Sequence, residues 1–117
     1  MSKKTEEGLR LLSKLVRARY GNRVKGLYRI NISEQYDYED EPDAEVVVVL
    51  TDGDWQPSDE SEKLSDLTYD VLLESDLFVL AEPIQESAWA DPSEAADPIW
   101  VRTLKARAKL LTEKVQA

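Results

Sequence analysis

The stretch Val46-Val47-Val48-Val49-Leu50 decides the fold of this 117-residue chain. It is too short for a buried helix, and its β-branched side chains favour an extended backbone. A strand without polar residues has no face to offer to water, so both of its faces must be covered. We therefore expect a central strand with other elements packed on each face of its sheet.

Two more strands are expected beside this one. One of them ends near Asn31. It is expected to be a strand because Val24, Tyr28 and Ile30 alternate with charged or small residues at the strand period of two. It leads into the central strand through an acidic connection of hairpin type. The other strand covers residues 76–81, which are again almost continuously apolar, and the proline that follows is expected to end it.

Apolar residues at helical spacing predict three long helices. Thr5 is expected to cap the first helix and Ser58 the second. The third is expected to start at Asp97-Pro98 and to continue towards the end of the chain. Its apolar face would comprise Trp100, Leu104, Ala108, Leu111 and Val115. The sequence thus predicts one α/β domain, residues 1–117, with helices on a small mixed sheet that has one hairpin and one helical crossover.

The residue types that are missing narrow the possible chemistry. The chain has no cysteine and no histidine, which excludes disulfides, thiolate metal sites and histidine acid–base catalysis. No stretch approaches the ~20 apolar residues of a membrane span, and the N-terminus lacks the apolar core of a signal peptide. We expect a cytoplasmic protein.

Charge is strongly segregated along the chain. Residues 1–25 carry eight Lys or Arg against two Glu, a net charge of +6, and residues 99–117 carry five against one, a net charge of +4. Residues 26–98 carry two against 21 acidic residues, a net charge of −19. The negative charge of residues 26–98 disfavours binding of nucleic acid at the acidic face and favours binding of a basic partner. The alternative is that the acidic residues only keep a small domain soluble.

Two carboxylates stand where the central strand begins. Side chains two apart on a strand point to the same side, so Asp43 and Glu45 are expected to project together. A divalent cation would need such a pair. The alternative is that the pair is only a solvated strand end.

The segment 26–50 resembles the core of the minimal nucleotidyltransferases, small members of the DNA polymerase β-like superfamily. Their signature is Gly-Ser, ten residues, and then Asp-x-Asp or Asp-x-Glu. Here Asn31-Ile32 stands in place of Gly-Ser, residues 33–42 supply the spacing, and Asp43-Ala44-Glu45 supplies the carboxylates. The order of the later elements is also similar, so the resemblance extends over nearly the whole chain.

The departures from the family pattern indicate a degenerate active site. In the family the glycine lets the backbone approach the triphosphate and the serine hydroxyl binds a phosphate. Asn31 adds a Cβ atom at the first position, and Ile32 has no hydroxyl at the second. The segment that follows is acidic and would repel a triphosphate, at roughly 1 kcal/mol for each close, water-screened pair. Its carboxylates are Glu34, Asp37, Glu39, Asp40 and Glu41.

One hypothesis that follows from the resemblance is a non-catalytic binding protein. Minimal nucleotidyltransferase-like proteins are frequently paired with an HEPN-type RNase toxin, so the chain would be the antitoxin-like partner and would need no cofactor. Its partner-binding surface would be the acidic segment with its two tyrosines, and a homo-oligomer is also open. The residues expected there are Glu34, Tyr36, Asp37, Tyr38, Glu39, Asp40 and Glu41.

The other hypothesis is an active nucleotidyltransferase. In that case Asp43 and Glu45 would be the catalytic metal ligands for Mg²⁺, and Asp76 is the one candidate for a third carboxylate. ATP would donate an adenylyl group to a hydroxyl of a protein, an RNA or a small molecule, with the metals neutralising phosphate charge. The missing phosphate-binding motif favours the non-catalytic hypothesis.

Overall fold

The computed structural model describes residues 3–30 and 42–111. In these ranges the elements follow one another as α1 (Lys3–Tyr20), η1 (Gly21–Arg23), β1 (Val24–Ile30), β2 (Ala44–Leu50), α2 (Pro57–Ser75), β3 (Val79–Gln85), α3 (Glu86–Ala90), η2 (Pro92–Glu94), α4 (Pro98–Ala106) and β4 (Ala108–Leu110). The η elements are single turns of 3₁₀ helix.

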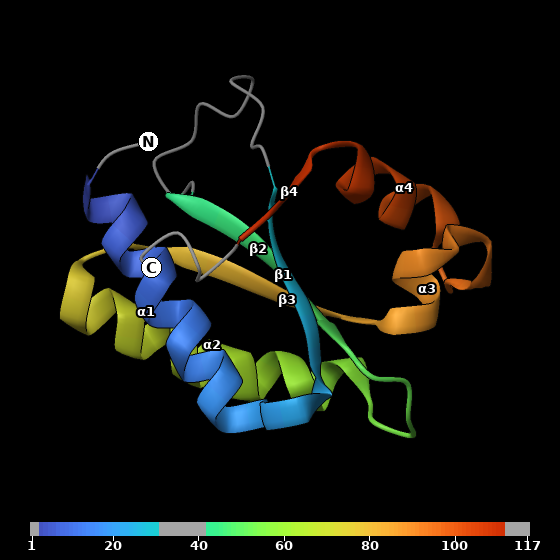
Figure 1. The fold of residues 1–117 in the computed structure, drawn as a ribbon, viewed down its shortest axis with the longest axis horizontal. Coiled ribbons are helices and arrows are strands. Elements are labelled where there is room, and N and C mark those ends of the chain that lie inside the picture. The colour runs from blue at the N-terminus through green and yellow to red at the C-terminus, as the bar shows by residue number, and fades with distance from the viewer. Residues whose placement is uncertain (1–2, 31–41, 112–117) are drawn as a thin grey trace.

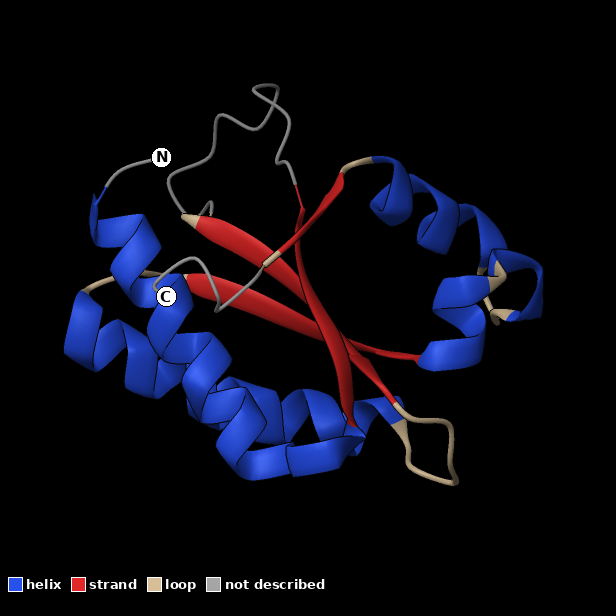
Figure 2. Ribbon diagram, viewed as in Figure 1, coloured by secondary structure: helices blue, strands red, loops and turns tan. Residues whose placement is uncertain are grey.

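The described strands form one mixed sheet in the order β3-β2-β1-β4 (Figures 1 and 2). β1 pairs with β2 in the antiparallel sense, while β2 pairs with β3 in the parallel sense. A parallel connection needs a crossover, which α2 provides. The α/β architecture expected from the sequence, with one hairpin and one helical crossover, is therefore confirmed.

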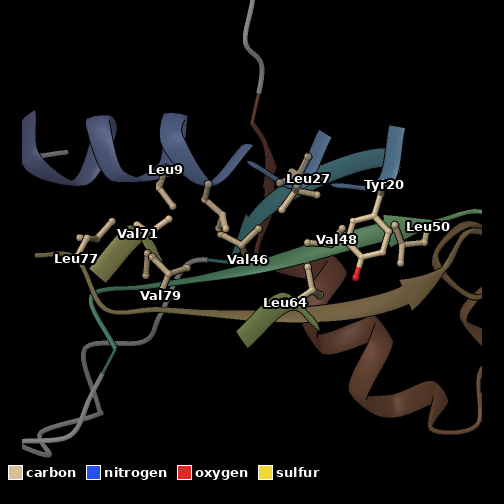
Figure 3. Close-up of a cluster of buried hydrophobic side chains, with 13 residues drawn as sticks. Leu9, Tyr20, Leu27, Val46, Val48, Leu50, Leu64, Val71, Leu77 and Val79 are labelled. Carbon is tan, nitrogen blue, oxygen red and sulfur yellow. The ribbon is translucent and has the colours of Figure 1, made fainter. Parts of the chain in front are cut away.

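Helices cover both faces of this sheet. α1 and α2 lie side by side on one face, and α3 and α4 pack on the other (Figure 2). Val46, Val48 and Leu50 point into the core under α1 and α2, which Figure 3 shows in detail. Val47 and Val49 point into the core under α3 and α4. All five side chains are at most 2% exposed, so the central strand is covered on both faces as predicted.

The third strand begins and ends later than expected. Asp76 adopts a left-handed conformation (φ 54°) as the C-cap of α2, and β3 runs from Val79 to Gln85. Pro83 does not end the strand but lies within it and pairs in register with Val48. β3 is at the edge of the sheet, and an edge strand can hold a proline because one side of its backbone has no ladder partner.

The last helix is shorter than the apolar spacing predicted, and this prediction was wrong. α4 ends at Ala106, and residues Ala108–Leu110 form β4 against β1. Leu111 continues the contact, because its N–H donates to the Leu27 carbonyl at 2.8 Å. The unpaired edge of β1 offers hydrogen bonds that a longer helix could not use. Trp100 is 41% exposed, whereas Val101 and Leu104 are buried. Val115 lies outside the described residues.

Two of the three expected helix N-caps differ from the observed helix starts. α1 already includes Lys3, so Thr5 lies within its first turn and is not the N-cap. α2 begins at Pro57, and its N-cap is Gln56, two residues before the expected Ser58. α4 begins as predicted, since the Asp97 carboxylate accepts a hydrogen bond from the Trp100 N–H at 3.1 Å.

Candidate functional site

Asp43 lies exposed at the residue before β2 and joins the starts of two strands. Its Oδ2 accepts a hydrogen bond from the Phe78 N–H at 2.9 Å. In return the N–H groups of Asp43 and Ala44 donate to the Phe78 carbonyl at 2.8 and 3.2 Å. One carboxylate oxygen of Asp43 is therefore already used to align β2 with the residue that precedes β3.

Glu45 is half-buried on the sheet face that α3 and α4 partly cover. In register it lies between Ile30 of β1 and Leu80 of β3. Burial raises the pKa of its carboxyl group, and the nearby Arg107 guanidinium acts in the opposite direction. Burial therefore disfavours the ionised form of Glu45 relative to the same group in water.

A second acidic residue, Glu82, belongs to the same face of the sheet. It pairs in register with Val47, two positions along β2 from Glu45. Burial raises the pKa of Glu82, and the negative charge of Glu45 raises it further. Residue spacing alone could not single out Glu82, because its proximity to Glu45 depends on the register between β2 and β3.

Asp76 is directed away from this pair. Its side chain is 93% exposed, and one carboxylate oxygen lies 3.5 Å from the Lys4 ammonium nitrogen on α1. α1 covers the opposite face of the sheet from Glu45. Within residues 3–30 and 42–111, no three acidic side chains come close enough to hold a metal ion together.

The remaining predicted site residues lie outside the described ranges. They include Asn31-Ile32, which replaces the phosphate-binding motif. They also include the whole predicted partner surface, namely Glu34, Tyr36, Asp37, Tyr38, Glu39, Asp40 and Glu41.

A groove of about 370 Å³ runs beside the edge strand β3. Residues 82–85 of β3 contribute to it, together with Trp55, Pro57 and Ser61 near the start of α2. Residues 87, 88, 94–97, 100 and 101 line it from α3, η2 and α4. We call this hollow the edge groove. Its parts come from distant segments of the chain, so no local motif could have predicted it.

The turn that carries Trp55 is fixed in place by hydrogen bonds. The indole N–H of Trp55 donates to the Thr51 carbonyl at 2.9 Å. The Ser87 N–H donates to the Asp52 carboxylate at 3.0 Å, and the bond to Ser87 lowers the pKa of Asp52. The Gln85 amide donates to the Gly53 carbonyl at 3.3 Å. These bonds tie residues 51–55 to the junction of β3 and α3.

The segregated charges are partly paired inside the domain. Glu60 of acidic α2 is only 3% exposed, and the Lys63 ammonium donates to its Oε2 at 3.2 Å. The Arg23 guanidinium lies 3.8 Å from its Oε1. Burial, followed by the Glu60 charge, raises the pKa of Tyr20 to about 12. The Arg23–Glu60 pair joins η1 to α2, and the Lys4–Asp76 pair joins α1 to the C-cap of α2.

Searches of protein-family models, curated proteins and solved structures found no match to this chain. None of the helices in the described ranges is long and apolar enough to cross a bilayer. The resemblance to the minimal nucleotidyltransferases therefore stays a prediction from the sequence.

Proposed function

We propose that this domain is a non-catalytic binding protein of nucleotidyltransferase-like architecture that associates with a basic protein partner. The observation that carries the proposal is that each candidate catalytic carboxylate already has another role or an unfavourable setting. Asp43 aligns β2 with Phe78, Glu45 is half-buried near Glu82, and Asp76 lies beside Lys4.

Metal-dependent nucleotidyl transfer makes a specific demand on these residues. Mg²⁺ binds in a nearly ideal octahedron at about 2.0–2.1 Å from its oxygen ligands. A carboxylate pair must therefore present ionised oxygens that converge on one point. The Phe78 N–H already binds one oxygen of Asp43, and burial disfavours the ionised form of Glu45. This supports binding as the function and leaves catalysis as the alternative.

The charge distribution supports a basic partner. Residues 26–98 carry a net charge of −19, and the pairs made with Arg23 and Lys63 involve a single acidic residue, Glu60. Most of the acidic side chains of α2 are exposed. Charge of one sign on a small domain accelerates encounter with a partner of the opposite sign.

The resemblance names the class of partner that we propose, an HEPN-type toxin. A neighbouring gene for a small all-helical protein with an Arg-x4-6-His motif would encode it. The test is association of this chain with the purified product of that gene. Neutralising Glu39, Asp40 and Glu41 together should slow association and flatten its salt dependence, whereas Tyr36→Ala should mainly speed dissociation.

The matched control neutralises three exposed carboxylates on α2, Asp59, Glu62 and Asp66. It changes the net charge by the same amount at a different place. If this control slows association as much as the first variant, the acidic segment is not the interface. If the pair does not associate at all, the antitoxin-like role is wrong.

A further inference from the structure

The edge groove combines aromatic and acidic side chains without any basic one. Trp55 and Trp100 both line it, and Trp100 is 41% exposed. Three carboxylates, Glu82, Glu94 and Asp97, share the same lining. No lysine or arginine is among the described residues that form the groove. Its volume of about 370 Å³ is at the lower end of the range for ligand pockets.

This combination suits a cation that is attached to an apolar stem. The face of a tryptophan ring attracts a guanidinium or ammonium group, and the attraction is strongest where water is partly excluded. Glu82 is half-buried, and both burial and Glu45 raise the pKa of its carboxyl group. A cation beside Glu82 would offset this unfavourable setting of the ionised form.

Two helix N-termini at the groove repel a cation, but their partial charges are smaller than the charges of the carboxylates there. α2 and α4 both begin there, and each helix N-terminus carries about half of a positive elementary charge. At α4 the Asp97 carboxylate already accepts from the Trp100 N–H. The full charges of Glu82 and Glu94 remain for a ligand, so the balance at the groove favours a cation.

The groove is also held in shape before any ligand arrives. The Trp55 turn is tied to Gln85 and Ser87, as described above. On the other side, the Asp97 cap fixes the start of the helix that carries Trp100. A site whose walls are already ordered loses less conformational entropy when it binds.

We propose that the edge groove binds an arginine or lysine side chain that an extended basic segment of a partner protein presents along β3. The occupant is a polypeptide side chain because the groove is open at the sheet edge. A free small molecule usually needs a pocket that buries most of its surface. The inference rests on the proposed function in one respect, namely that the partner is a basic protein.

Three side chains of the groove contact the bound cation in this proposal. The Trp100 ring stacks on the guanidinium or ammonium group, and the Glu82 carboxylate pairs with its charge. Trp55 contacts the methylene stem from the other wall. Because Glu82 must be ionised to pair, affinity should rise as the pH rises through its raised pKa.

The experiment uses the indole N–H signals of the full chain, which has three tryptophans. The probe is a five-residue peptide with blocked ends and one central arginine, compared with the same peptide carrying neutral citrulline. We expect the signals of Trp55 and Trp100 to shift with saturation. Trp89 should shift least, because it is buried against the Tyr28 ring. The arginine peptide should bind about ten times more tightly than the citrulline peptide.

Matched variants locate the site. Glu82→Gln and Trp100→Ala should each weaken binding of the arginine peptide by about a factor of five to ten. Asp70→Asn and Tyr69→Ala change an exposed carboxylate and an exposed ring on α2, outside the groove. These two controls should leave the affinity within about a factor of two. Each variant alters a side chain that is not fully buried, so the fold should persist.

Three results would overturn the inference. The first is equal binding of the arginine and citrulline peptides. The second is a loss of binding in Asp70→Asn as large as that in Glu82→Gln, which would indicate general charge attraction. The third is binding of ethylguanidinium as tight as that of the peptide, which would make the occupant a small molecule. In each case the association with the whole partner, measured separately, would still decide the proposed function.

Discussion

The two faces of the sheet differ in how completely they are covered. Under α1 and α2, Leu12, Val16, Leu64 and Val71 have no exposed surface. On the other face, Leu80 is 41% exposed and two half-buried carboxyl groups, Glu45 and Glu82, lie among apolar neighbours. The first face is a closed core, and the second is partly open and carries charge. We therefore expect the first face to supply most of the stability, and we propose that the second face takes part in binding.

The largest expected effect comes from deleting a leucine on each face. Leu12→Ala should lower the free energy of unfolding by about 3 kcal/mol, because it leaves a cavity in a closed core. Leu80→Ala should lower it by less than about 1 kcal/mol, since its side chain is already 41% exposed. Urea denaturation of both variants measures the difference. Equal losses of unfolding free energy in the two variants would mean that both faces contribute equally to stability.

A smaller effect is expected at the charge cluster that joins η1 to α2. Glu60→Gln should lower the free energy of unfolding by about 1–2 kcal/mol, because Arg23 and Lys63 lose a buried partner. Both cations are about two-fifths exposed, at 41% and 42%, so water compensates for part of the loss. Glu62→Gln, at an exposed position of the same helix, is the control. A loss no larger than that of the control would show that the cluster does not stabilise the fold.

The half-buried Glu82 on the second face should make the stability of the domain depend on pH. The folded-state pKa of Glu82 is raised above its ordinary value of 4.5, so folding favours the protonated form. This contribution is fully present below the ordinary pKa and is lost as the pH rises through the folded-state pKa. Glu82→Gln removes the loss, so the variant should gain stability relative to the wild type between about pH 4 and pH 7. Melting temperatures of the variant and the wild type at the two pH values measure the gain. If the variant gains no stability, the Glu82 carboxyl group is as well hydrated in the folded state as in the unfolded state.

The sequence predicted those parts of the fold that depend on one segment at a time. The run from Val46 to Leu50 identified the central strand, and the alternation in residues 24–30 identified its neighbour. The end predicted for the third strand at Pro83 was wrong, because a proline ends a central strand but not an edge strand. The position of a strand in the sheet cannot be read from its own residues. The helix predicted over Ala108 was wrong, because residues 108–110 pair with the open edge of β1 although their apolar spacing fits a helix.

For the candidate site, sequence reasoning located the carboxylates but not their surroundings. Asp43 and Glu45 do stand at the start of the central strand. The bond from Phe78 to Asp43, the proximity of Glu82 to Glu45 and the edge groove all depend on how β2 and β3 align. Such contacts between distant segments are set by tertiary packing, which residue spacing does not report.

Calorimetric titration with ATP–Mg²⁺ tests most directly whether the domain is a binding protein rather than an enzyme. We predict a dissociation constant in the millimolar range, roughly −4 kcal/mol or weaker, because Asn31-Ile32 lacks the glycine and hydroxyl of the phosphate-binding motif. Asp43→Asn should leave this weak binding unchanged, since an asparagine oxygen can still accept from Phe78. Micromolar binding that Asp43→Asn abolishes would contradict the account and assign Asp43 to a working metal site.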